Sequence, residues 1–455
     1  MSKNKILPGR VWFNLIMFGF IGQIAWNVEN MYFNTFLYNS VYSGVSQTAI
    51  DGSMSVMTAI SKMVSWSAIT AVLTTFVMGN LSDNMHKRKA FIGIGYILWG
   101  IVTAAFGFIT RDNVALLFGL SDEVKILGTT VMTVIVMDCV MTFMGSTAND
   151  SAFNAYVTEV SDTSNRATIE SILTILPIAA TGVVLGLGAL VDGIGYSTFF
   201  MLLGGTVVVC GIIGMFTLTE TEHGEKESAK EYFKNLIYGF RPSVIKANSK
   251  LYIVLTAMCV YSVAVQVFFP YILIYLEHRL GFSLDMLANL KIYHFAIAGV
   301  AIVGVVVGLI FLGRLIDKLG KRVFMIVSLV LFIAGLFAMG QASSLLPALI
   351  AAIPTLCGYG LLGIIFSAAV RDYTPTDKVG LFQGVRMIFF VLIPMFVGPK
   401  IGDYACRLSD ATYINEYGVA QTVPTASMFT AAAIVGLVAI IPVVILLVKG
   451  IDKER

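Results

Sequence analysis

Long apolar stretches recur along this chain, and they limit its fold more than any other feature of the sequence. A helix needs about 20 predominantly apolar residues to cross the hydrocarbon core of a bilayer. Of the 455 residues, 57% are hydrophobic and 13% are charged, whereas a soluble protein carries about 25% charged residues. We therefore predict an all-α membrane protein with twelve transmembrane helices. The predicted spans cover residues 11–38, 56–79, 90–110, 128–154, 167–190, 197–218, 251–276, 287–312, 323–341, 345–369, 380–402 and 427–449.

The distribution of lysine and arginine predicts the orientation of these spans. If the N-terminus is cytoplasmic, 23 of the 30 basic residues fall in cytoplasmic segments and six fall on the opposite face. An excess of basic residues marks the cytoplasmic side of a membrane protein. We therefore expect a multi-pass protein of the cell (inner) membrane with both termini in the cytoplasm.

One substantial polar segment, residues 219–250, separates the first six spans from the last six. Within it, EYFKNLIYGF (231–240) carries apolar residues at helical spacing, which predicts an amphipathic helix on the membrane surface. The predicted organisation is an N-terminal six-helix bundle (1–218), a central cytoplasmic loop with that helix (219–250) and a C-terminal six-helix bundle (251–455).

A short polar phrase occurs twice, in GNLSDNMHKRK (79–89) and in GRLIDKLGKR (313–322). Both copies read Gly, any residue, Leu, any residue, Asp and then a basic cluster, and they are offset by 234 residues. They follow the second and the eighth predicted spans, which are equivalent places in the two halves. An internal repeat of six spans is typical of a secondary transporter whose substrate site lies between the halves.

This phrase resembles the signature of the major facilitator superfamily. The resemblance implies the major facilitator fold, with two six-helix pseudo-repeats and alternating access. It also implies that contacts of the two aspartates and their basic neighbours hold the cytoplasmic side closed. The matching positions are Gly79, Asp83, Lys87 and Arg88 in the first copy and Gly313, Asp317, Lys321 and Arg322 in the second. The first copy departs from the pattern at Asn84 and His86.

Residues 149–167, NDSAFNAYVTEVSDTSNRA, resemble the end of the fourth span in the glycoside–pentoside–hexuronide cation symporters of the melibiose permease type, and in the related sucrose transporters. That resemblance implies that Asp150 binds sugar. Asn154 stands where the family has tryptophan. Ala68 and Val72 stand where the family has paired sodium-binding aspartates, so proton coupling is favoured over sodium coupling.

The first span carries four amides, Gln23, Asn27, Asn30 and Asn34, at helical spacing. Amides that face lipid are costly, so these face a wet cavity or neighbouring helices. We favour a cavity wall that binds the hydroxyl groups of a sugar-like solute, and packing between helices is the alternative.

Glu29 and Lys62 lie within the first and second spans, where charges are rare and usually paired. We expect an ion pair between them. Glu29 would either carry the coupling proton or form a static salt bridge, and Lys62 could instead extend to the membrane surface.

Asp138, together with Thr142, Gly145 and Asn149, forms a polar stripe on the fourth span. We expect Asp138 to handle a proton or another cation. Asp150 and Asn154, four residues apart, share a face and are predicted to bind the solute, although Asp150 could instead pair with a basic gate residue. In the seventh span, Gln266 is a further candidate for solute binding.

The sequence therefore favours a secondary active transporter that moves a small polar solute, most consistent with a sugar or glycoside, by proton-coupled symport. An exporter of amphipathic compounds is the alternative, because the chain has 21 methionines and 31 phenylalanines. No nucleophile elbow or phosphate-binding loop indicates an enzyme, and no histidine or cysteine cluster indicates a metal. We expect no cofactor and no nucleic-acid partner. The expected partners are the lipid bilayer, the solute and a proton or other cation, and the expected state is a monomer.

Overall fold

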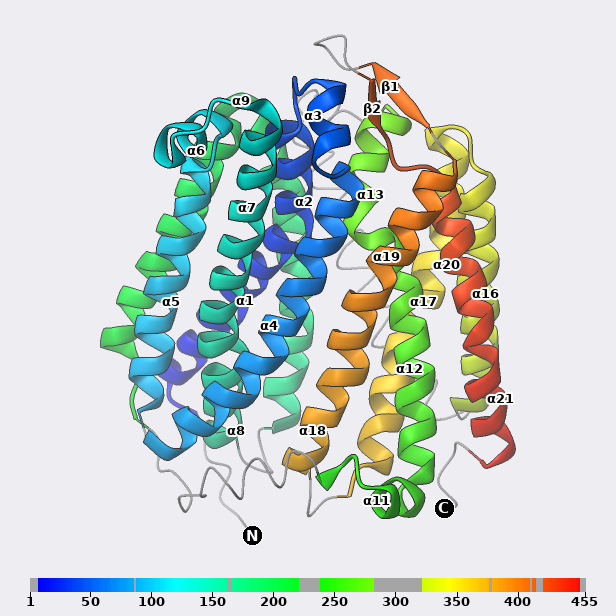
Figure 1. Cartoon of the computed structure of the whole chain (residues 1–455). Coiled ribbons are helices and arrows are strands. Elements are labelled where there is room, and N and C mark those ends of the chain that lie inside the picture. Colours follow the sequence, from blue (N-terminus) through cyan, green and yellow to red (C-terminus); the bar gives the residue numbers. More distant parts are fainter. Residues whose placement is uncertain are drawn as a thin grey trace, which may run out of the picture. The chain divides into compact units, whose positions relative to one another are not determined.

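The computed structural model describes residues 7–85, 87–161, 166–220, 238–281, 321–375, 379–409, 411–414 and 420–450. The chain forms two compact units. Unit 1 comprises Met1–Ala229 with Asn415–Val419, and unit 2 comprises Lys230–Ile414 with Ala420–Arg455. The described residues are almost entirely helical (Figure 1).

Unit 1 is built from long helices that alternate with short irregular turns. In chain order its elements are α1 (Gly9–Val28), η1 (Glu29–Phe33), α2 (Asn34–Phe36), η2 (Leu37–Val41), α3 (Gln47–Gly52), α4 (Val56–Met85), α5 (Arg88–Ala105), η3 (Phe106–Phe108), α6 (Arg111–Phe118), α7 (Glu123–Gly145), η4 (Ser146–Phe153), α8 (Asn154–Val160) and α9 (Arg166–Thr217).

Unit 2 has the same character and adds one small antiparallel pair of strands, β1 with β2. Its described elements are α11 (Pro242–Ala247), α12 (Ser249–Phe268), η5 (Phe269–Tyr271), α13 (Ile272–Ile274), η6 (Tyr275–Arg279), α16 (Lys321–Gln341), α17 (Leu345–Tyr373), α18 (Val379–Met387), η7 (Ile388–Leu392), α19 (Ile393–Leu408), β1 (Thr412–Ile414), β2 (Ala420–Thr422), α20 (Ser427–Val438) and α21 (Ile440–Val448).

Ten helical segments within the described residues are long and apolar enough to cross a membrane. The predicted fifth and sixth spans both lie in α9, which Gly195 interrupts with a φ of 72° and a ψ of 160°. Only the second of them, Gly193–Thr217, is among the ten. The predicted eighth span, 287–312, lies outside the described residues, as does most of the predicted amphipathic helix at 231–240. The arrangement is consistent with twelve transmembrane helices.

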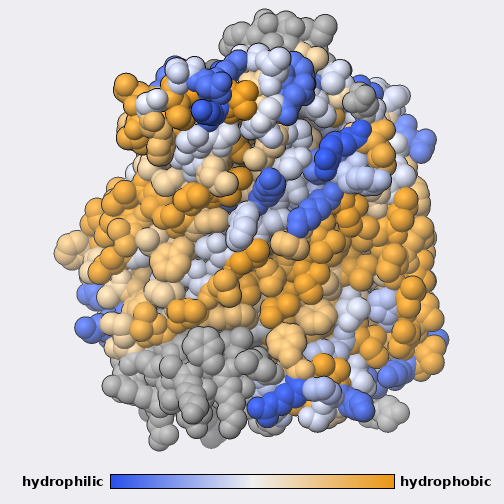
Figure 2. All heavy atoms as spheres, viewed as in Figure 1, coloured by the Kyte–Doolittle hydropathy of each residue, from blue (hydrophilic) through white to orange (hydrophobic). Residues whose placement is uncertain are grey.

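The outer surfaces of the helices agree with a lipid environment. Figure 2 shows hydrophobic residues over α5 in unit 1 and over α20 and α21 in unit 2. Leu98 and Ile101 of α5, and Ile441 and Val444 of α21, are exposed. Apolar side chains of this kind are favourable against lipid, which replaces water as their solvent.

A glycine-lined contact joins α5 to α9. A Cβ atom on Gly100 would lie 2.5 Å from the carbonyl oxygen of Gly204 and 2.6 Å from the amide nitrogen of Val208. The backbones can approach this closely because neither glycine carries a side chain. The same antiparallel register places Gly93 against Gly211 and Gly107 against Ser197. We call this contact the α5–α9 seam.

Two segments of π-helix contain candidate acidic residues, Glu29 in one and Asp150 in the other. Segment η1 (Glu29–Phe33) continues α1, and segment η4 (Ser146–Phe153) continues α7. A π-helical turn contains one more residue than an α-helical turn and occurs frequently at functional sites. The residues that follow each segment are therefore rotated relative to a continuous α-helix.

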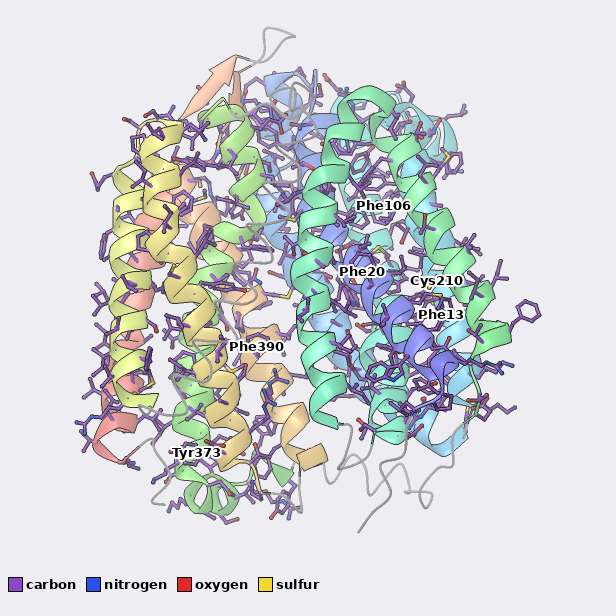
Figure 3. The ribbon with its side chains drawn as sticks, turned by 180° about the vertical axis from the view of Figure 1, so that it is seen from behind. Phe13, Phe20, Phe106, Cys210, Tyr373 and Phe390 are labelled. Carbon is purple, nitrogen blue, oxygen red and sulfur yellow. The ribbon has the colours of Figure 1, made fainter. Side chains whose placement is uncertain are left out.

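Aromatic residues pack the end of unit 1 beyond η1. The rings of Phe33 and Phe106 are stacked with centroids 4.0 Å apart, and Phe200 lies edge-on to Phe33 at 5.2 Å. All three side chains are fully buried. Phe106 lies among the helices of this unit (Figure 3). This cluster holds η1 against η3 and α9.

Candidate functional site

Glu29 lies at the centre of a buried polar cluster that joins three spans of unit 1. It is the first residue of η1 and is 7% exposed. Its Oε1 atom accepts hydrogen bonds from Ser67 Oγ of α4 at 2.7 Å and from Thr142 Oγ1 of α7 at 3.0 Å. The two hydroxyl oxygens are themselves 2.7 Å apart. Three oxygen atoms from three spans therefore form a compact triangle.

Asp138 adds a second carboxyl group to this cluster. It lies one helical turn before Thr142 on α7 and is 1% exposed. Its side chain lies close to Ser67, and when both acids are ionised its charge repels that of Glu29. One oxygen of each acid, Glu29 Oε2 and Asp138 Oδ1, has no hydrogen-bond partner among the described residues.

Asp150 lies in the π-helical segment η4 and is half-buried. Its Oδ2 atom accepts a hydrogen bond from Ser146 Oγ at 2.9 Å. The preceding residue, Asn149, donates to the hydroxyl oxygen of Tyr96, which in turn donates to the Phe18 carbonyl at 2.8 Å. The charge of Asp150 acts on both Glu29 and Tyr96. The acidic residues of α7 and η4 thus belong to one polar region of the unit.

None of these three carboxyl groups forms an ion pair with a lysine, arginine or histidine that the structure describes. Three ionised carboxylates in a low-dielectric interior would repel one another and would be poorly solvated. The arrangement therefore favours states in which protons or other cations offset part of the negative charge.

The expected ion pair between Glu29 and Lys62 does not form. Lys62 is exposed, whereas Glu29 is buried and bonded to Ser67 and Thr142. The reason is helical geometry, because Lys62 and Ser67 are five residues apart on α4 and so face different directions.

The amides of the first span bond mainly to their own helix. Asn27 Nδ2 donates to the Gln23 carbonyl at 2.8 Å, and Asn34 Nδ2 donates to the Asn30 carbonyl at 2.7 Å. Asn30 makes the same contact one turn earlier. Thr181 of α9 donates to Asn27 Oδ1 at 3.1 Å, which is a contact between helices. Gln23, Asn27 and Asn30 keep some exposed surface, whereas Asn34, which follows the π-helical turn, is buried.

The two remaining solute-binding candidates lie in different units. Asn154 begins α8, is exposed and donates to the Asp150 carbonyl at 3.0 Å. Gln266 lies in α12 of unit 2, is half-buried and packs against Gly398 of α19.

Arg88, which belongs to the first copy of the repeated phrase and is the first residue of α5, forms an ion pair with Glu159. Arg88 is 4% exposed, and its Nε and Nη2 atoms lie 3.0 and 2.9 Å from Glu159 Oε1. Its Nη1 atom donates to Ser82 Oγ. Of the other motif positions, Gly79 lies in α4, and Lys87 and Arg322 are exposed. The side chains of Asp83 and Lys321, together with Gly313 and Asp317, lie outside the described part of the structure.

Several members of the polar region carry no recognisable sequence signal. Tyr96 is a single polar residue within an apolar stretch. Ser67 and Ser146 have other serines and threonines close by in the sequence, and such residues are common in membrane helices. Thr142 is different, because its four-residue spacing from Asp138 places both on one face of α7.

The comparisons with known proteins agree with this architecture. The family model described as Major Facilitator Superfamily matches residues 30–399 and 291–455. No curated protein matches the chain by sequence. Similar solved structures include a mutant of the nucleoside transporter NupG, with 12% identity, a TM-score of 0.66 and coverage of 96% of this chain and 98% of that one.

Two further structures share the fold. One is a bacterial homolog of the human lysosomal transporter Spinster in an inward-facing, occupied conformation, with 12% identity, a TM-score of 0.65 and 97% coverage of both chains. The other is the xylose transporter XylE from E. coli in an inward-open conformation, with 13% identity, a TM-score of 0.63 and 95% coverage of both chains. The long family match and the helical architecture together show that this chain is a multi-pass membrane transporter that belongs to the major facilitator superfamily.

Proposed function

We propose that this transporter moves a small polar solute, a sugar or glycoside, by proton-coupled symport with alternating access. The observation that carries the proposal is the set of carboxyl groups in unit 1, Glu29, Asp138 and Asp150, which lack a basic partner among the described residues. Ionisable residues inside a membrane usually serve ion or substrate pathways.

Glu29 and Asp138 are assigned the coupling role. They are the more deeply buried of the three acids, and they share Ser67 as a neighbour. Protonation of either acid removes one of two repelling charges from the membrane interior, which makes proton binding favourable. A coupling group must gain and lose its proton as the transporter changes conformation, and an acid without a fixed cation can do so.

Asp150 and the amides of the first span are assigned to the solute. Asn27 and Asn30 keep exposed surface beside their backbone contacts, so their amides can still bind a hydroxyl group. Carboxylate and amide groups together suit a solute with several hydroxyls. The names of two structural neighbours, a xylose transporter and a nucleoside transporter, support a sugar-containing solute.

An exporter of amphipathic compounds remains the second candidate. It requires aromatic and methionine side chains on the binding surface. In unit 1, however, Phe33, Phe106 and Phe200 pack against one another in the core. The polar residues of the first and fourth spans therefore favour the symporter.

The first test is a thermal-shift screen of the purified chain against sugars, glycosides, nucleosides, amino acids and hydrophobic cations. A ligand that binds the folded state raises the unfolding midpoint. We expect hits among sugars or glycosides that disappear in Asp150→Ala and weaken in Asn27→Ala. Hits confined to hydrophobic cations would overturn the sugar assignment in favour of the exporter.

Coupling is then tested in proteoliposomes with the solute found by the screen. Glu29→Gln should abolish accumulation driven by an inward proton gradient and preserve solute exchange. Lys62→Gln is the matched control, because Lys62 is exposed and outside the cluster, and it should accumulate solute like the wild type. Wild-type accumulation by Glu29→Gln would remove Glu29 from the coupling mechanism.

A further inference from the structure

The connection between the predicted third and fourth spans forms a short helix, α6 (Arg111–Phe118), which ends in three exposed apolar residues. Leu116, Leu117 and Phe118 are 85%, 78% and 55% exposed, and Leu116 is the most exposed large apolar side chain among the described residues. Exposure of such a run to water is unfavourable, and contiguous exposed apolar residues usually mark an interaction site. We call these three residues the α6 tip.

Contacts at both ends of α6 hold the tip in place. Thr110 Oγ1 accepts a hydrogen bond from the Asn113 amide at 3.1 Å, and Asn113 Nδ2 donates to the Phe108 carbonyl at 2.8 Å. At the other end, Gly119 closes the helix with a φ of 63°, a conformation that glycine adopts readily. Val114 is the buried residue of the helix. The α6 tip is therefore the end of a capped helix that is tied to its unit.

The tip follows an apolar stripe on α5. Ile94, Leu98 and Ile101 are exposed on α5 at spacings of four and three residues, which is one face of a helix. Phe108 of η3, just before α6, is exposed as well. Figure 2 shows hydrophobic residues beside hydrophilic ones over α6, at the end of unit 1 where this connection lies (Figure 1). An apolar surface that continues a lipid-facing stripe fits lipid better than it fits a water-soluble partner.

Polarity changes along α6 rather than around it. The exposed face carries Asp112 and Asn113 on the first turn and Leu116 and Leu117 on the second. Residues four apart share a face, and they are separated by about 6 Å along the helix axis. This order suits the boundary of a bilayer, where interfacial helices bury their apolar side chains by about 5–10 Å.

The charges around the tip give no reason for binding to anionic lipid. Residues 111–125 carry two basic and three acidic side chains, Arg111, Lys125, Asp112, Asp122 and Glu123. The Nη2 atom of Arg111 donates to the Ser43 carbonyl at 2.6 Å, so this guanidinium is already engaged. Attraction between basic residues and anionic headgroups therefore cannot supply the binding energy, whereas burial of apolar surface can.

We propose that Leu116, Leu117 and Phe118 insert into the adjacent bilayer leaflet and anchor this end of unit 1 among the acyl chains near the headgroups. The distribution of lysine and arginine predicts that this is the outer leaflet. Since α6 packs against α7, the anchor fixes the depth of the span that carries Asp138. The partner is lipid of any headgroup charge, so the inference is independent of the proposed solute and of its coupling to protons.

The test measures the depth of α6 by electron paramagnetic resonance in nanodiscs that hold one copy of the chain. A nitroxide is attached to Leu117→Cys, with the five native cysteines replaced by alanine. Asp112→Cys is the matched control, because it is exposed on the preceding turn. Oxygen concentrates among acyl chains and a nickel chelate stays in water, so the ratio of their collision rates with the nitroxide reports depth. We expect this ratio to be several-fold higher at residue 117 than at residue 112.

The lipid and salt dependence tests the mechanism of insertion. The ratio at residue 117 should be the same in zwitterionic and anionic nanodiscs and at low and high salt, because apolar burial is not screened by ions. Loss of oxygen access at high salt would make the contact electrostatic and would overturn the proposal.

A second measurement uses the unmodified chain in the same nanodiscs, so it remains decisive if the cysteine-free chain does not fold. Hydroxyl radicals generated in water oxidise accessible side chains, which mass spectrometry detects. We expect residues 116–118 to be oxidised much more slowly than in the denatured chain.

The proposal fails if residue 117 is as accessible to nickel as residue 112, or if residues 116–118 are oxidised as fast as in the denatured chain. Nickel access in nanodiscs combined with dipolar broadening between labels in detergent would instead assign the α6 tip to contact with a second copy. None of these results depends on solute accumulation, so failure of the anchor would leave the proposed function standing.

Discussion

The α5–α9 seam makes a quantitative prediction about helix packing. In Gly204→Ala, the new Cβ would lie 2.5 Å from the amide nitrogen of Ala104 and 2.7 Å from its Cβ atom. The carbonyl oxygen of Gly100 lies closer still, and ordinary contact begins near 3.4 Å, so α5 and α9 must separate locally by at least 0.9 Å. Overpacking of this kind typically costs about 1–3 kcal/mol. The neighbouring Gly205 provides the control, because a Cβ there meets no atom within 4 Å.

The comparison of the two substitutions isolates the cost of packing. Both exchange glycine for alanine in the same helix, so the gain in helix propensity of about 1 kcal/mol is common to them. We therefore expect Gly204→Ala to be less stable than Gly205→Ala by about 1–3 kcal/mol. The free energy of unfolding can be measured by SDS titration in mixed micelles with tryptophan fluorescence. Equal stabilities would refute the argument that this seam depends on direct backbone contact.

Three further predictions concern single residues of unit 1. Glu159→Gln should destabilise the chain by about 2–5 kcal/mol, because it removes the charge of the carboxylate that bonds the Nε and Nη2 atoms of buried Arg88, and an unchanged SDS midpoint would contradict this. Gly195→Ala should cost about 1–3 kcal/mol, because its φ of 72° and ψ of 160° are nearly restricted to glycine; wild-type stability in the same titration would show that the turn relaxes. Lys62→Met should leave both stability and solute accumulation within error of the wild type, since Lys62 is exposed, and loss of accumulation in proteoliposomes would return Lys62 to the coupling mechanism.

The spans were predictable because the thickness of the bilayer fixes their length and apolar character. The turn within α9 also has a sequence signal, since Gly195 stands between two predicted spans. On α7, the spacing of Asp138 and Thr142 predicts the face that meets Glu29, because that part of the helix is regular.

The partners of Glu29 could not be predicted in the same way. A charged residue such as Lys62 attracts attention in an apolar span, but helical geometry directs Ser67 rather than Lys62 toward Glu29. The π-helical segment η1 adds a second difficulty, because it rotates Asn34 relative to Gln23 and Asn27. Such a turn depends on tertiary contacts, and residue spacing alone does not reveal it.

The π-helical segments also affect how this chain can be aligned and edited. Each contains one residue more than an α-helical turn, and one residue corresponds to about 100° of rotation and about 1.5 Å of length in an α-helix. A relative with a continuous α-helix would therefore match the first span only after a one-residue gap near Glu29–Phe33. Deletion of a single residue there would shorten the span very little, but it would rotate the two ends of the helix relative to each other. Glu29 would then lose its present orientation relative either to the amides before it or to the aromatic residues after it. The length of this segment, as much as the identity of its residues, is thus part of what the sequence encodes.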